Sequence, residues 1–132
     1  MCLAYDKEVD DRTRARLDEK GFIWGYKVVN RYPTFQSGWM VESLYFRYEW
    51  KIGINYSDRR FPGIVIRERD SGYINKGFHF FLTRRAAKGE SGYNTSHNIV
   101  MKVKCYKKDF VAAGFFGPKH SAVFTQACHS YY

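Results

Sequence analysis

A strict alternation of apolar and polar residues constrains this chain more than any other feature. In residues 44–54, Leu44, Phe46, Tyr48, Trp50 and Ile52 alternate with tyrosine and charged residues. A period of two places alternate side chains on opposite faces of an extended strand. Residues 98–106 repeat the pattern: Ile99, Met101, Val103 and Cys105 alternate with Val100, Lys102 and Lys104. The sequence therefore predicts a β-rich fold.

The other predicted strands are short and bounded by glycine, proline or polar residues. They are residues 22–29, 63–67, 77–82, 109–114 and 121–128. One long helix is expected from about residue 6 to 20, because this segment is rich in helix-forming charged residues and is followed by Gly21. Val9, Thr13 and Leu17 form its narrow buried stripe. A short helix follows Thr83, whose hydroxyl can cap it.

These elements fit one domain of 132 residues, of which 45% are hydrophobic. The predicted fold class is α+β, with an N-terminal helix in residues 1–21 and a basic, β-rich body in residues 22–132. The body is a twisted, largely antiparallel sheet with one short helix after the 77–82 strand. We read Trp24, Trp39 and Trp50 as core residues.

Positive charge is concentrated in the body. The net charge is +9, but residues 1–20 carry five basic and six acidic side chains, whereas residues 21–132 carry seventeen and seven. Such a field attracts polyanions such as nucleic acids and nucleotides. Ordinary solubility is the alternative explanation, and the charge alone does not decide between them.

The N-terminus becomes charged within six residues, and no uncharged run is long enough to span a bilayer. Three cysteines, Cys2, Cys105 and Cys128, lack the close spacing of a zinc site. We read them as free thiols and expect a cytoplasmic protein with no metal, no cofactor and no membrane association.

Arginines and aromatic residues recur together along the body, which is typical of a cleft for phosphates and bases. Local pairing with acidic residues is the alternative for the arginines. Arg59, Arg60, Arg84, Arg85 and Lys104 are the expected phosphate contacts; Tyr26, Tyr56 and Phe81 are the expected stacking residues, and His79 would orient the ligand.

Three features carry competing interpretations. His79, among phenylalanines, is either a ligand contact or a structural histidine bonded to a backbone carbonyl. Lys102, Lys104, Lys107 and Lys108 either follow a phosphate backbone or protect an exposed strand edge. Cys2 becomes an N-terminal nucleophile if Met1 is removed, or is a small buried residue.

Several strings resemble a family of small bacteriophage and bacterial proteins that begin Met-Cys-Leu and carry a Gly-Phe-His-Phe-Phe motif. Those strings are Met-Cys-Leu at 1–3, Gly-Tyr-Lys-Val at 25–28, Tyr-Glu-Trp-Lys-Ile-Gly at 48–53, Ser-Asp-Arg at 57–59, Gly-Phe-His-Phe-Phe-Leu-Thr at 77–83, Val-Lys-Cys-Tyr-Lys-Lys-Asp-Phe-Val-Ala-Ala-Gly at 103–114 and Ala-Val-Phe-Thr at 122–125. The resemblance implies a phage-encoded protein in the host cytoplasm and assigns no reaction.

The order of the 77–82 strand, a short helix and a Val-x-Val strand is similar to the middle of ADP-ribosyltransferase-like domains. That likeness would place Tyr26-Lys27 at the first-strand position, His79 near the central position and Gln126 where those enzymes hold a carboxylate. No acidic residue follows Asp109, so the transition-state cation would lack its carboxylate. The likeness therefore implies at most a degenerate NAD-binding domain.

The leading interpretation is an accessory protein that binds a phosphorylated ligand without bond chemistry. The ligand is a nucleic acid or a nucleotide, an immune second messenger included. The alternatives are an ADP-ribosyltransferase-like enzyme, with weak catalytic candidates in His79, Gln126 and Cys2, and a protein–protein inhibitor of a host factor.

Overall fold

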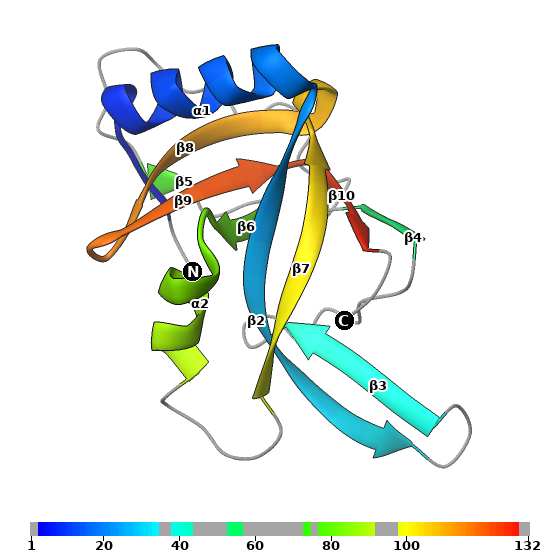
Figure 1. Ribbon diagram of the computed structural model, residues 1–132. Helices are drawn as coiled ribbons and strands as arrows, with labels where there is room; N and C mark the ends of the chain where they lie inside the picture. Colours follow the sequence, from blue (N-terminus) through cyan, green and yellow to red (C-terminus); the bar gives the residue numbers. More distant parts are fainter. Residues whose placement is uncertain are drawn as a thin grey trace.

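A computed structural model describes residues 3–34, 38–43, 53–56, 73–74, 77–91 and 98–129 of the chain. Two helices, α1 (Lys7–Lys20) and α2 (Arg84–Ser91), accompany one sheet (Figure 1). The strands are β1 (Leu3–Tyr5), β2 (Phe22–Thr34), β3 (Gly38–Ser43), β4 (Gly53–Tyr56), β5 (Tyr73–Ile74), β6 (Phe78–Phe81), β7 (Asn98–Tyr106), β8 (Phe110–Phe116), β9 (Lys119–Phe124) and β10 (Gln126–His129), and a 3-10 turn, η1 (Lys107–Asp109), joins β7 to β8. The predicted α+β class, with its N-terminal helix and short second helix, is confirmed.

Neighbouring strands in the sheet follow the order β4-β10-β7-β2-β6-β9-β8-β1-β5, with β3 paired to β2. Every pairing is antiparallel. The most extended contact is between β2 and β7, in register from Phe22 opposite Tyr106 to Asn30 opposite Asn98. Beyond that contact β2 continues with β3 as a two-stranded ribbon that leaves the body of the sheet (Figure 1).

Two predicted strands have different boundaries in the structure. β2 runs on through Pro33, where the sequence predicted an end, because β3 pairs with it from Val29 to Thr34, past the last residue paired with β7. The predicted strand of residues 121–128 is divided at Thr125, whose backbone N–H donates to the carbonyl of Asp109 at 2.9 Å. β9 therefore pairs with β6 and β8, whereas β10 pairs with β4 and β7. The predicted strand of residues 63–67 and most of that of 44–54 lie outside the described residues.

Both ends of α1 are capped by the groups that its sequence supplies. The Asp6 side chain accepts from the N–H of Val9 at 3.0 Å. Gly21 ends the helix with φ of 78° and donates its N–H to the carbonyl of Leu17. A left-handed cap of this kind favours glycine. Val9, Thr13 and Leu17 are buried as predicted.

A buried carboxylate joins α1 to β8. Asp10 is 2% exposed, and its Oδ1 accepts from the N–H of Ala113 at 2.9 Å while its Oδ2 accepts from Arg14 Nε at 2.6 Å. The carbonyl of Ala113 accepts from the N–H of Asp6. The backbone N–H and the carbonyl of Ala113 are thus both bonded to residues at the start of α1. Strand β1 ends at Tyr5 and cannot pair with Ala113, so Asp10 supplies the acceptor that the N–H of Ala113 needs.

The two faces of β2 have different roles. Its odd-numbered residues, such as Ile23 and Val29, enter the main core with Phe80, Met101 and the α1 stripe. Gly25 lets the strands approach closely, because a Cβ there would lie 2.8 Å from Phe80 Cβ. The even-numbered residues point to the opposite face, where α2 covers one end. This second face holds the candidate site.

We predict that Asp10→Ala destabilises the fold by about 2–4 kcal/mol, because it leaves the Ala113 N–H buried without an acceptor. Asp10→Asn retains an acceptor oxygen and should cost less. Asp11→Ala, which removes only an exposed pair with Lys7, is the control and should cost about 0.5 kcal/mol or less. Urea unfolding measures all three, and equal losses for Asp10→Ala and Asp11→Ala would contradict the docking role.

Candidate functional site

Aromatic and cationic side chains share the uncovered end of the second face of β2 and β7. We call this surface the cation–aromatic face. It consists of Phe22, Trp24 and Tyr26 from β2, Lys102, Lys104 and Tyr106 from β7, and Arg84 from α2. Cross-strand register sets Trp24 opposite Lys104 and Tyr26 opposite Lys102. The strand period therefore produces a row of rings beside a row of ammonium groups.

Each cation of this face lies over a ring. Lys102 Nζ is 4.2 Å from the centroid of Trp24, and Lys104 Nζ is 4.2 Å from that of Phe22. Lys104 is also 5.5 Å from the ring of Tyr106, which is 37% exposed. Contacts of this kind at exposed sites are worth about 0.5–1 kcal/mol each. That is weak enough for a ligand to replace them.

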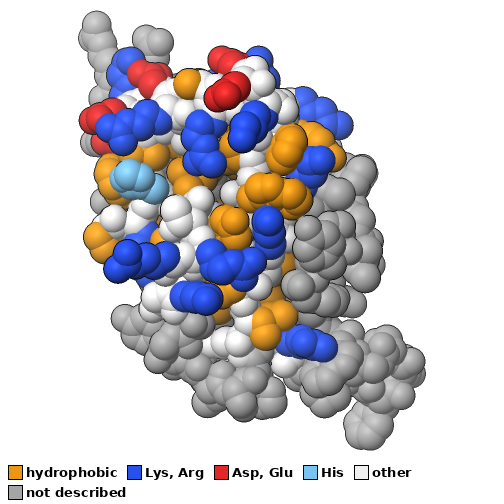
Figure 2. All heavy atoms as spheres, in the orientation of Figure 1, with side chains coloured by type: hydrophobic (Ala, Val, Ile, Leu, Met, Phe, Trp, Pro, Cys, Tyr) orange, Lys and Arg blue, Asp and Glu red, His pale blue; other side chains and the backbone are white. Residues whose placement is uncertain are grey.

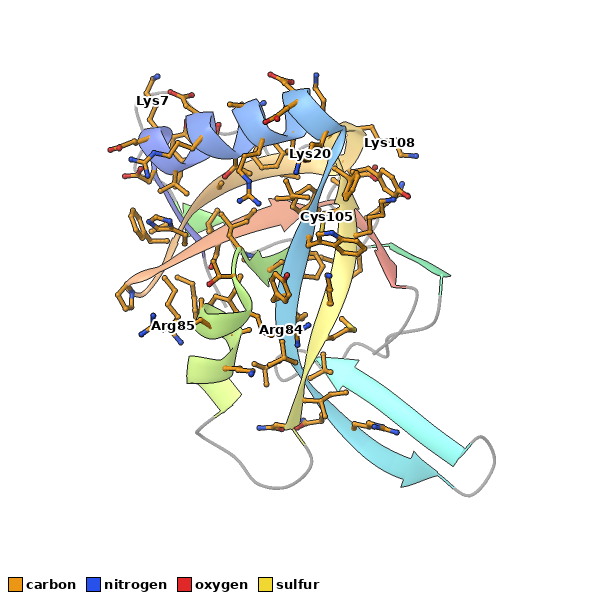
Figure 3. The ribbon with its side chains drawn as sticks, in the orientation of Figure 1. Lys7, Lys20, Arg84, Arg85, Cys105 and Lys108 are labelled. Carbon is orange, nitrogen blue, oxygen red and sulfur yellow. The ribbon has the colours of Figure 1, made fainter. Side chains whose placement is uncertain are left out.

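Helix α2 supplies the guanidinium at the lower end of the face. The Thr83 hydroxyl caps the helix by accepting from the N–H of Ala86, as predicted. Arg84 Cζ lies 5.2 Å from the ring centroid of Tyr26, whereas Arg85 points away from β2 (Figure 3). Two arginines in a first turn oppose the helix dipole, so helix stability does not explain them.

The ion pairs between described residues do not include the cations of this face. Each ion pair between described residues involves a carboxylate of α1: Asp11, Glu8, Asp10 or Asp18. Figure 2 shows the acidic side chains gathered over α1, while lysine and arginine side chains alternate with hydrophobic ones below it. Arg84, Lys102 and Lys104 form no ion pair with a carboxylate of the described residues. The acidic residues of 57–72, which were the expected partners of the arginines, lie outside the described residues, so local pairing of the arginines stays an alternative.

Three of the predicted site residues come together on this face: Tyr26, Arg84 and Lys104. Lys107, one of the four lysines predicted to follow a phosphate backbone or protect a strand edge, instead forms an ion pair with Asp18, with its Nζ at 2.6 Å from the carboxylate. The alternative of edge protection is wrong for Lys104, because this residue pairs with Trp24 of β2 on one side and with Cys128 of β10 on the other. The interpretation of Trp24 as a core residue is also wrong, because it is half-buried on this face.

Two predicted ligand contacts are buried instead. His79 is 5% exposed, with Nδ1 3.2 Å from the carbonyl oxygen of Gly77, which agrees with the structural alternative. Phe81 is 3% exposed and packs with Val28, Ala87 and Phe116 beneath α2. Neither side chain can contact a ligand on the surface, because such burial leaves no ring face open.

Of the remaining predicted residues that the structure describes, Gln126 and Arg85 make no hydrogen bond, ion pair or ring contact with the rings or cations of this face. Gln126 is half-buried at the start of β10, opposite Tyr56 of β4 in the strand register. Arg85 is exposed on α2. Cys2, Arg59 and Arg60 lie outside the described residues, so their proposed roles stay predictions.

The sequence analysis overlooked Phe22 and Trp24 as surface residues. Their spacing of two, continued by Tyr26, was the available signal, because it places all three on one face. That face could be assigned to the surface only once β2 was paired with β7, since the register sets the lysines beside the rings.

One lysine lies on the core side of β2. Lys27 Nζ donates to the carbonyl of His79 at 3.1 Å and lies 5.8 Å from the ring of Phe80. Burial lowers the pKa of the Lys27 ammonium from 10.5 to about 8. Burial of the charged Lys27 ammonium therefore lowers the free energy of unfolding at neutral pH.

We predict that Lys27→Met stabilises the protein at pH 7 by on the order of 1–3 kcal/mol. The unfolded chain binds this proton more tightly than the folded one between pH 8 and 10.5, so the stability of the original protein should rise with pH through that window. The advantage of Lys27→Met should therefore shrink as pH rises. Parallel stability profiles of the two proteins from pH 7 to 10, measured by urea unfolding, would contradict the shift.

The described residues contain no group of three side chains able to hold a metal ion. None of the helices in the described ranges is long and apolar enough to cross a membrane. Comparison of the chain with family models, curated proteins and solved structures gave no match. The candidate function consequently depends on the residues of the cation–aromatic face.

Proposed function

We propose that the protein binds a phosphorylated, base-containing ligand, a nucleic acid or a nucleotide, on the cation–aromatic face. The observation that supports this proposal most is the pairing of Lys102, Lys104 and Arg84 with rings, and not with any carboxylate of the described residues. Cations that are not held in an ion pair keep their attraction for phosphate.

Binding would proceed by electrostatic capture followed by stacking. The positive body attracts the ligand, and Lys102, Lys104 and Arg84 swing from the rings to phosphate oxygens. Each cation–ring contact given up is worth about 0.5–1 kcal/mol, whereas stacking of a base on the freed ring returns about 1–3 kcal/mol. The exchange is therefore favourable, and it requires no bond chemistry.

Two variants of equal charge test the role of the face. Lys102→Gln/Lys104→Gln removes both ammonium groups of β7, and Lys7→Gln/Arg16→Gln removes two cations from the exposed side of α1. Lys7 stands at the end of α1 far from Lys108 and the β7 turn (Figure 3). Any effect of net charge alone would be the same in both.

We predict that the β7 variant binds a labelled single-stranded dodecathymidylate roughly tenfold more weakly at 50 mM salt. Its plot of log K against log salt should be shallower by about 1.4, since each lost single-strand phosphate contact removes about 0.7. The α1 variant should stay close to the original protein. Fluorescence anisotropy gives both quantities. Undetectable binding of this oligonucleotide and of ATP, or equal losses in the two variants, would refute the proposal.

A further inference from the structure

The rings of the cation–aromatic face are spaced for a chain of separated bases. Phe22, Trp24 and Tyr26 follow one another at every second residue of β2, which corresponds to about 6.6 Å along the strand. The ring centroids of Phe22 and Trp24 are 5.8 Å apart and their planes meet at 83°, so neighbouring rings face in different directions. Stacked bases in a duplex repeat at about 3.4 Å. Successive rings can therefore each take a base only if the bases are no longer stacked on one another.

This spacing excludes a duplex as the ligand that uses the rings. In a duplex the bases are paired and stacked inside, and the phosphates alone reach a flat sheet surface. In a single strand the bases are free to lie on aromatic side chains while the backbone follows a row of cations. The rings of β2 form one row and the ammonium groups of β7 form a second row beside it, which matches a ligand with bases on one side and phosphates on the other.

The ring row is bounded by the start of β2 at one end and by the part of β2 that α2 covers at the other. Phe22 follows the C-terminal cap of α1 directly, and the ammonium of Lys107 beside it is already bonded to Asp18. At the other end Val28 is buried under α2 with Ala87. Three half-buried rings, Phe22, Trp24 and Tyr26, lie on this face of β2 between those two positions, so the row has a length of about three bases.

We infer that the ligand is single-stranded nucleic acid, bound with about three consecutive bases on Phe22, Trp24 and Tyr26 and its phosphates along Lys102, Lys104 and Arg84. This inference rests on the proposed function and narrows it, because a duplex and a free mononucleotide are excluded as the preferred ligands.

The first experiment varies the length and the strandedness of the probe. Oligothymidylates of one to eight nucleotides, and a duplex of twelve base pairs beside its single strand, are titrated into the full-length protein by anisotropy or calorimetry. Affinity should rise by at least an order of magnitude between one and three or four nucleotides, then grow slowly, because a third stacked base completes the row. The single strand should bind at least tenfold more tightly than the duplex.

The second experiment replaces the central ring. Trp24→Leu should weaken binding of the four-nucleotide probe between about fivefold and about 100-fold, whereas Trp24→Phe keeps an aromatic face and should lose less. Tyr26→Leu gives an independent second position if Trp24→Leu does not fold, as judged by circular dichroism. Base stacking on Trp24 should also quench part of the protein's tryptophan fluorescence, and that part should vanish in Trp24→Phe.

The outcomes separate the inference from the proposed function. Equal affinity for thymidine monophosphate and the four-nucleotide probe, equal affinity for duplex and single strand, or unchanged binding in Trp24→Leu and Tyr26→Leu would overturn the inference. If binding in those cases still depended on Lys102 and Lys104 and fell with salt, the proposed function would stand. Loss of dependence on the two lysines would overturn both.

Discussion

Nine residue pairs in unbroken register hold β2 against β7, from Phe22 opposite Tyr106 to Asn30 opposite Asn98. A slip of one residue in such a pairing moves every side chain of a strand to the other face. The register thus fixes two things together. It buries Ile23, Val29, Met101, Val103 and Cys105 in the core, and it sets the rings of β2 beside the lysines of β7. Core and candidate site depend on the same hydrogen bonds.

The two helices divide the faces of this strand pair. Helix α1 closes the core and is joined to β8 by the buried Asp10, whereas α2 covers only the Val28 end of the opposite face. That difference leaves the cation–aromatic face open over a short length. The acidic side chains of α1 pair largely with cations of the same helix, and within the described residues the cations of β7 form no ion pair (Figure 2).

Much of the fold was predictable because local signals agreed with tertiary packing. The bounds of β7, the Gly21 cap of α1 and the Thr83 cap of α2 follow from residue type and spacing alone. The predictions fail where a partner distant in the sequence decides the structure. Thr125 interrupts a predicted strand because it bonds to Asp109, and β2 extends past its predicted end because it pairs with β3 there. No local pattern predicts such a partner.

For the candidate site, the sequence by itself determined which side chains are available. It provides a positively charged body in residues 21–132, aromatic residues at a spacing of two and lysines at the same spacing. Of the predicted ligand contacts, Tyr26, Arg84 and Lys104 lie on the cation–aromatic face, whereas His79 and Phe81 are buried by packing. Only the tertiary structure decided which residues share a surface. The physical reason is that alternation gives each strand two equivalent faces, and strand pairing with helix cover determines which of them meets solvent.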